Sequence, residues 1–198
     1  MNVLIVHESM FGNTHQIASA IAEGMRQGGA DGDVRVVHVD DAPTTIADGL
    51  RQGRSPDLGD VHVVHVDDAP TVIPDDVDLL LVGGPTHALG MSRPKTREDA
   101  TTKGATPAHE GVREWIQAVT PRPGLPVVTF DTRVHVKMLP GSAASAAAKA
   151  LRHHGFDRAE RGETFWVEGT PGPVEAGELE RARAWGAQLA SRVSHGVA

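Results

Sequence analysis

The first 25 residues constrain the fold of this chain more than any other part of its sequence. Residues 3 to 6 read Val-Leu-Ile-Val, which is typical of a strand buried on both faces of a parallel sheet. A polar loop follows over residues 9 to 14, and an amphipathic helix begins at once. This strand–loop–helix unit predicts an α/β fold with the loop at the carboxyl end of a central strand.

The loop from Ser9 to Thr14 has the features of an anion site. Free backbone N–H groups and the positive end of the helix dipole meet at a helix N-terminus, which suits a phosphate. Ser9 and Thr14 add hydroxyl donors, and Gly12 lets the backbone approach a ligand closely. The first 25 residues contain no Lys or Arg, so neutral donors would hold the anion. The loop lacks the motifs of nucleoside-triphosphate and dinucleotide sites, which favours a single phosphomonoester. A plain turn with Asn13 or Thr14 as N-cap is the alternative.

Composition limits the partners and the compartment. A chain of 198 residues is long enough for one domain with a full core. Its formal net charge of −7 disfavours nucleic acid or an anionic membrane as the main partner. Cysteine is absent, which excludes disulfides and thiol catalysis. An early strand leaves no room for a signal peptide, and no apolar run approaches about 18 residues. We therefore expect a single domain over residues 1–198 of a soluble, cytoplasmic protein.

Strand and helix patterns alternate along the rest of the chain. Further strands are expected at residues 34–39, 79–82, 126–130 and 163–167, and further helices at 108–119, 142–154 and 178–193. Gly155 follows the second of these helices as the residue that ends it. The pattern predicts a doubly wound parallel sheet of order 2-1-3-4-5, with helices on both faces and ligands at the carboxyl ends of the strands.

One segment occurs twice. Residues 33–44 recur as residues 60–71, and only Arg35 differs, its counterpart being His62. Two copies are too few for a solenoid, so we interpret residues 33–59 and 60–71 as a tandem duplication within the domain. Only one copy can lie beside the first strand. The other is expected as an edge strand or a loop remote from the site, and an exposed edge could support a homodimer.

Two further loops complete the predicted site and carry a family resemblance. Residues 83–94 and 131–133 both leave the carboxyl ends of expected strands. The chain resembles the flavodoxin family in Glu-Ser-Met-Phe-Gly-Asn-Thr at 8–14, in Leu-Val-Gly-Gly-Pro-Thr-His at 81–87, and in its order of strands and helices. The resemblance implies a flavodoxin-like fold and an FMN cofactor, with the phosphate on the first loop and the isoalloxazine ring between the other two. The cofactor-binding residues that it implies are Ser9, Met10, Phe11, Gly12, Asn13, Thr14, Pro85, Thr86, His87, Ala88, Leu89, Gly90, Met91, Asp131, Thr132 and Arg133.

The chain departs from the family pattern in its aromatic residues. Phe11 stands where a second Thr is usual in the phosphate loop. The family commonly stacks Trp or Tyr on the flavin, yet this chain has no tyrosine. Its three tryptophans, at 115, 166 and 185, are expected in the core. Leu89 and Met91 could cover one ring face instead, so we expect a flavin without an aromatic sandwich.

Three functions are compatible with these observations. The resemblance implies an electron carrier between redox partner proteins. An NAD(P)H-dependent quinone or flavin reductase of the same fold would need a pocket over the flavin, and a flavin-free interaction module would keep only the fold. No Ser/His/Asp or paired-carboxylate arrangement stands out, so no catalytic residue is assigned. The histidines, among them His62 and His65, are expected to be structural or solvated, and no metal site is assigned.

Overall fold

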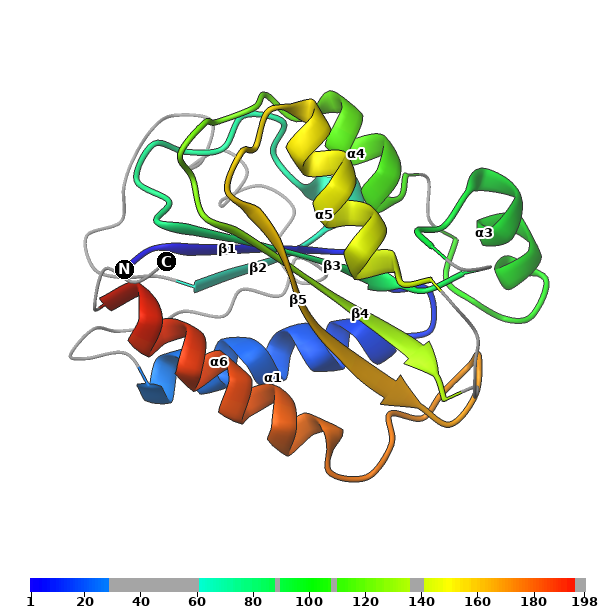
Figure 1. Cartoon of the computed structure of the whole chain (residues 1–198). Helices are drawn as coiled ribbons and strands as arrows, with labels where there is room; N and C mark the ends of the chain where they lie inside the picture. The colour runs from blue at the N-terminus through cyan, green and yellow to red at the C-terminus, as the bar shows by residue number, and fades with distance from the viewer. Residues whose placement is uncertain (29–60, 88–89, 108–109, 136–140, 195–198) are drawn as a thin grey trace.

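The strands form one parallel sheet. The computed structural model describes residues 1–28, 61–87, 90–107, 110–135 and 141–194 (Figure 1). Within them a five-stranded sheet has the order β2-β1-β3-β4-β5, which confirms the predicted order. All four strand pairs are parallel. The strands are β1 Val3–His7, β2 Val61–His65, β3 Leu79–Pro85, β4 Val127–Val134 and β5 Ala159–Val167.

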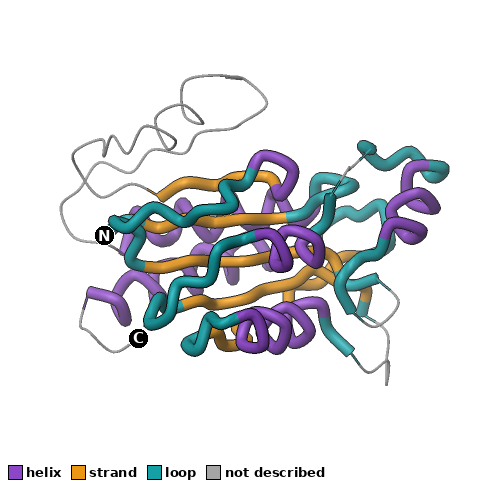
Figure 2. Tube along the Cα trace, turned by 90° about the horizontal axis from the view of Figure 1, so that it is seen from above, coloured by secondary structure: helices purple, strands orange, loops and turns teal. Residues whose placement is uncertain are grey.

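Helices cover both faces of the sheet. Helices α1 (Asn13–Gly28) and α6 (Glu178–Ser194) lie on one face, and α4 (Val112–Ala118) and α5 (Ala143–His154) lie on the other (Figures 1 and 2). Successive side chains of each strand point to opposite faces of the sheet, so the strands contribute to two separate cores. Leu4 and Val6 pack on the α4/α5 side, whereas Val3 and Ile5 pack on the α1/α6 side. No described helix is long and apolar enough to cross a membrane.

Some element boundaries differ from the sequence-based expectation. Helix α5 begins and ends as predicted, because the Ser142 side chain accepts from the Ser145 N–H (3.1 Å) and Gly155 adopts a φ of 112°. Helix α4 begins at Val112 rather than at residue 108. Helix α3 (Pro94–Thr101) was not predicted. Its sequence is polar and buries only two residues, so it lacks the apolar stripe that marks a helix in a sequence.

The three tryptophans occupy different environments. Trp115 is buried, as predicted, and Trp185 is partly buried against the α1/α6 core. The prediction that Trp166 is a core residue is wrong. It is half-buried on β5, an outer strand of the described sheet, and its ring stacks on His135 with centroids 4.4 Å apart.

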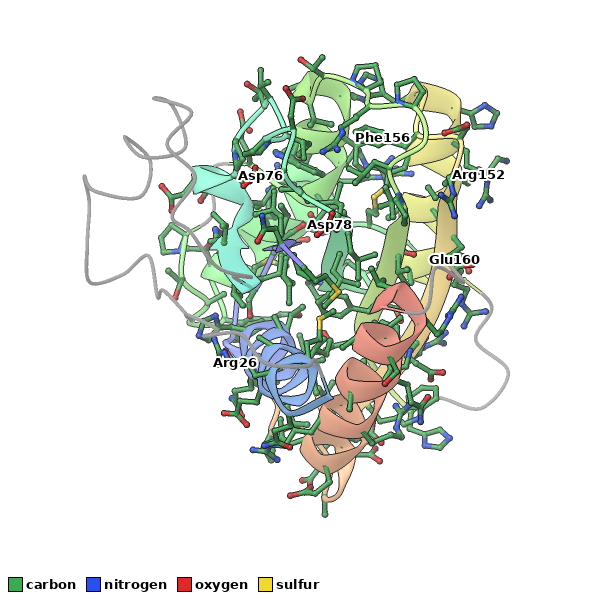
Figure 3. All side chains as sticks on the ribbon, turned by 90° about the vertical axis from the view of Figure 1, so that its left-hand side faces the viewer. Arg26, Asp76, Asp78, Arg152, Phe156 and Glu160 are labelled. Atoms are coloured by element: carbon green, nitrogen blue, oxygen red, sulfur yellow. The ribbon has the colours of Figure 1, made fainter. Side chains whose placement is uncertain are left out.

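Helices α1 and α6 touch through their backbones. They lie side by side beneath the sheet (Figure 3). A Cβ atom on Gly24 would lie 1.8 Å from the carbonyl oxygen of Arg183, and one on Gly186 would lie 2.2 Å from that of Ile21. No side chain larger than hydrogen fits at either position. The Arg183 Nε atom donates to Glu23 Oε2 at 2.7 Å beside this contact. The two glycines therefore set the distance between α1 and α6.

The second copy of the duplicated segment forms β2. Val61 pairs with Val3 and His65 pairs with His7 in the parallel register. The second copy therefore takes the place beside the first strand. The first copy, residues 33–44, lies outside the described residues, so the prediction of an edge strand or loop for it stays a prediction. The turn before β3, with Asp76 and Asp78, lies at the end of the sheet that faces the viewer in Figure 3, where Asp78 Oδ2 accepts from the Asn2 N–H at 2.8 Å.

Deletion of residues 33–59 should leave a folded protein. The second copy and its pairing with β1 are retained, and the remaining connection from α1 to β2 falls within the usual length of such loops, about two to six residues. Thermal unfolding should shift by only a few degrees, as measured by circular dichroism. Val63→Asp, at a buried position of β2, is the control that should unfold the protein. Loss of cooperative unfolding in the deletion variant would contradict the prediction.

Candidate functional site

A cavity of about 190 Å³ lies where the predicted loops meet, at the carboxyl ends of the strands. Ten of the residues predicted for the site line it: Ser9, Met10, Phe11, Asn13, Thr14, Pro85, Thr86, His87, Thr132 and Arg133. Gly12, Gly90, Met91 and Asp131 are not among its lining residues, and Ala88 and Leu89 lie outside the described residues. The topology thus brings the three predicted loops together around one hollow.

The first loop presents backbone donors. Gly12 has a φ of 81°, a left-handed conformation that glycine adopts without strain. The Gln16 N–H donates to the Gly12 carbonyl (3.0 Å) and begins the α1 hydrogen-bond ladder. In the described part of the chain, the N–H groups of residues 10 to 14 have no hydrogen-bond acceptor. They leave a set of donors at the positive end of the α1 dipole.

Threonine hydroxyls connect the loops across the cavity. The hydroxyls of Thr14 and Thr132 lie 2.8 Å apart and share a hydrogen bond, which joins α1 to β4. The Thr86 hydroxyl, from the end of β3, accepts from the Ala143 N–H at 2.8 Å. All three threonines line the cavity. The site therefore offers neutral hydroxyl groups from three elements of the fold.

Asp131 lies beneath the cavity and holds its walls. Its side chain is fully buried. Its carboxylate accepts from the hydroxyls of Thr86 (2.7 Å) and Thr164 (2.6 Å) and from the Ala144 N–H (3.2 Å). These bonds join β3, β4, β5 and the first turn of α5. In this structure Asp131 positions Thr86, which faces the cavity, and does not face it itself.

Backbone hydrogen bonds join two described residues of the second loop. His87 and Gly90 exchange backbone hydrogen bonds of 2.9 and 3.0 Å. Burial lowers the pKa of His87, and the charge of Lys103 lowers it further, so the imidazole is neutral at physiological pH. Met91 is buried in the core cluster that also contains Val112. This packing does not support the expectation that Met91 covers a flavin ring.

A fourth wall, not predicted from the sequence, comes from the segment between β5 and α6. Val167 and Thr170 line the cavity. Gly172 approaches the first loop so closely that a Cβ atom on it would lie 2.4 Å from Asn13 Oδ1. No motif marks this segment, because its position depends on the return of the chain from β5 to α6, next to α1. Its glycines and prolines at 169–173 were the only available signal, and they indicate no more than a turn.

Glu178 and Arg181 fix this segment at its end. The Trp166 N–H donates to Glu178 Oε2 at 2.7 Å, and Arg181 Nε donates to Glu178 Oε1 at 2.9 Å. Burial alone would raise the pKa of Glu178, but the bonds from Arg181 and from the Trp166 N–H outweigh it and lower the pKa. The carboxylate is therefore ionised and holds the start of α6 against the end of β5.

A buried carboxyl group lies directly before the first loop. Glu8 is 1% exposed, and its Oε2 atom accepts from the Val112 N–H at 3.0 Å. Burial raises the pKa of Glu8, although hydrogen bonds from the Ser92 hydroxyl and the Val112 N–H oppose the shift. Among the described residues, Oε1 has no hydrogen-bond partner. Glu8 therefore links the first loop to the α4 side of the sheet.

The donor set fits a phosphate ester. Unbonded N–H groups at a helix N-terminus, hydroxyls from Ser9, Thr14 and Thr132, and a left-handed glycine provide several donors for phosphate oxygens. Arg133 also lines the cavity, with its Nη1 atom donating to the Gly141 carbonyl at 2.6 Å. The sequence indicated neutral donors in the first loop; the third loop adds one cation.

Comparisons with known proteins bear on the fold. No family model and no curated protein matches the chain. Among solved structures, a flavodoxin from the domain Archaea is 16% identical, covers 98% of this chain and 100% of its own, and has a TM-score of 0.57. Flavodoxin 1 from Bacillus cereus is 16% identical, covers 96% and 98%, and has a TM-score of 0.58. Rubredoxin oxygen:oxidoreductase from Desulfovibrio gigas is 15% identical over all of this chain and 37% of its own, with a TM-score of 0.52. The chain therefore has a flavodoxin-like fold.

Proposed function

We propose that this protein binds FMN and carries electrons between redox partner proteins. The observation that carries the proposal is the set of unbonded N–H donors of residues 10 to 14, which opens onto a cavity lined by hydroxyl groups. This arrangement occurs in a fold shared with flavodoxins. A bound flavin would supply the redox chemistry, and the residues of the chain would position it.

Different residues around the cavity would bind different parts of FMN. The first loop, with the hydroxyls of Ser9 and Thr14, would bind the phosphate. Thr86 and Thr132 would bind the polar chain that follows it, and the loops at 85–87 and 131–134 would flank the ring. Phe11, one of the residues expected to bind the cofactor, lines the cavity and supplies it with an aromatic side chain.

The size of the cavity favours a carrier over a substrate-specific enzyme. Sites that enclose a small molecule usually measure about 300–1,000 Å³, and this cavity measures about 190 Å³. Part of a flavin bound here would extend beyond it and remain accessible to a partner protein. A reductase would instead need a pocket over the flavin, often closed by a second subunit.

The first experiment is purification followed by desalting. The proposal expects a yellow protein whose flavin absorption survives, and a colourless protein that takes up FMN with quenching of flavin fluorescence would also support it. Absence of FMN binding by titration would overturn it. Oxidation of NAD(P)H by the flavin-loaded protein with a quinone as acceptor would favour the reductase over the carrier.

Thr14→Val should weaken FMN binding by about 1–3 kcal/mol, the range for a hydrogen bond to a charged group. Valine keeps the shape of threonine and removes the hydroxyl that lies 2.8 Å from that of Thr132. The dissociation constant is measured by fluorescence titration. Thr120→Val, at an exposed position between α4 and β4, is the matched control and should bind FMN like the wild type. Equal affinities for both variants would remove Thr14 from the site.

A further inference from the structure

Three histidines meet beside the first loop. His7 ends β1, His65 ends β2, and the parallel register pairs them. Both side chains lie on the face covered by α1, as do Ile5 and Val63 two residues before them. The rings of His7 and His65 contact each other edge to face, with centroids 5.6 Å apart. His15, in the first turn of α1, places Nδ1 3.2 Å from His7 Nε2.

Two of these histidines bind Ser9. The Ser9 N–H points to His65 Nε2 at 3.3 Å, and the Ser9 hydroxyl accepts from the His15 N–H at 3.2 Å. The Asp67 N–H also points to the Nδ1 atom of His65, at a distance of 3.4 Å. A neutral imidazole has one acceptor nitrogen, so these two bonds to the ring belong to alternative tautomers. Asp67 Oδ2 lies 3.7 Å from Nδ1 and favours the proton there, which leaves Nε2 to accept from Ser9.

We propose that His65 is a positioning residue of the anion site and that its uptake of a proton strengthens anion binding. This inference rests on the proposed phosphate site in the first loop. In a protonated imidazole both nitrogens are donors, so Nε2 can no longer accept from the Ser9 N–H. That N–H becomes available to an anion. At the same time a positive charge appears beside a loop that contains no Lys or Arg.

The groups around His65 determine the direction of the effect. In the described part of the chain they come from three elements: His7 on β1, His15 on α1 and Asp67 next to β2. Asp67 is the acidic group among them, and His7 and His15 are the two that can also take up a proton. Glu8 lies on the other face of β1, near Val112. By linkage, an anion bound at Ser9 must make His65 bind its proton more tightly.

Sulfate is the probe for this linkage. A phosphomonoester changes its own charge near pH 6, whereas sulfate keeps its charge throughout the range in which imidazoles titrate. The experiment follows the His65 Hε1 resonance of the full chain by NMR as the pH changes, with and without sulfate. We expect sulfate to move the His65 titration to higher pH, and sulfate affinity to rise about three- to tenfold from pH 8 to pH 6.

Two variants separate His65 from the other histidines. His65→Gln keeps an acceptor oxygen for the Ser9 N–H but gains no proton, so its sulfate affinity should not depend on pH. His153→Gln, exposed at the end of α5, is the matched control and should behave like the wild type. The NMR titration uses the wild-type chain, so the test stands even if His65→Gln does not fold.

The outcomes distinguish this inference from the proposed function. A His65 titration that sulfate does not move overturns the inference, and so does a pH dependence that persists in His65→Gln. FMN binding that is equal in the wild type and in His65→Gln at pH 6 and pH 8 supports the proposed function and also overturns the inference. A sulfate-dependent His65 titration in a protein that binds no FMN supports the inference for an anion site and overturns the flavin function.

Discussion

Gly186→Ala should lower the free energy of unfolding by about 1–3 kcal/mol, and Gly24→Ala should do the same. Each added methyl group would meet a backbone carbonyl oxygen of the neighbouring helix, at 2.2 Å for Gly186 and 1.8 Å for Gly24. Backbone atoms cannot turn away as a flexible side chain can, so α1 and α6 must separate. Alanine has the higher intrinsic helix propensity by about 1 kcal/mol, so the measured loss understates the cost of the contact. Urea unfolding followed by circular dichroism gives the value.

Gly169→Ala is the control for this pair. Gly169 lies in the segment between β5 and α6, and a Cβ atom on it would meet its nearest neighbours at 3.7 and 3.8 Å, an ordinary contact. Its unfolding free energy should stay within about 0.5 kcal/mol of the wild type. A stability of Gly186→Ala equal to that of this control would show that α1 and α6 are not in backbone contact.

Asp131→Ala should lower the free energy of unfolding by about 3–5 kcal/mol and should also weaken FMN binding. The substitution leaves the hydroxyls of Thr86 and Thr164 and the Ala144 N–H without their acceptor in a buried place. Thr86 then loses its fixed orientation at the cavity. Unfolding free energy and FMN affinity are both measured, the second at a temperature where the variant is folded.

Asp99→Asn is the control for Asp131, because Asp99 is exposed on α3 and its change should alter neither quantity. Asp131→Asn retains one acceptor oxygen and should lose less stability than the alanine variant. A stable Asp131→Ala protein with unchanged FMN affinity would show that the carboxylate neither supports the walls nor positions Thr86.

The sequence predicts the central part of this fold because each central strand is buried on both faces. The apolar runs at 3–6 and 79–82 leave few alternatives, and the alternation of strands and helices then determines the sheet order. The same reasoning brings Thr14, Thr86 and Thr132 together at one edge of the sheet. Thr14 and Thr86 follow the carboxyl ends of β1 and β3, and Thr132 lies near the end of β4.

The features that the sequence did not predict depend on tertiary contacts between distant segments. Val167 and Thr170 line the cavity, and Gly172 approaches Asn13, only because the chain returns from β5 to the side of the sheet where α1 lies. The sequence suggests that Met91 covers a flavin ring, but Met91 is buried in the core cluster that contains Val112. The histidine cluster depends on the register that pairs His7 with His65. A search for histidines at the ends of neighbouring strands on the same face would have found it.

The contact between α1 and α6 also bears on the order of events during synthesis. Residues 13–28 emerge from the ribosome about 150 residues before their partner, residues 178–194. At elongation rates of about 5–20 residues per second, the apolar face of α1 stays unpaired with α6 for at least several seconds. The segment that contains Gly172 is synthesised only shortly before α6. The cavity of a nascent chain should therefore be completed late, after α6 has packed beside α1.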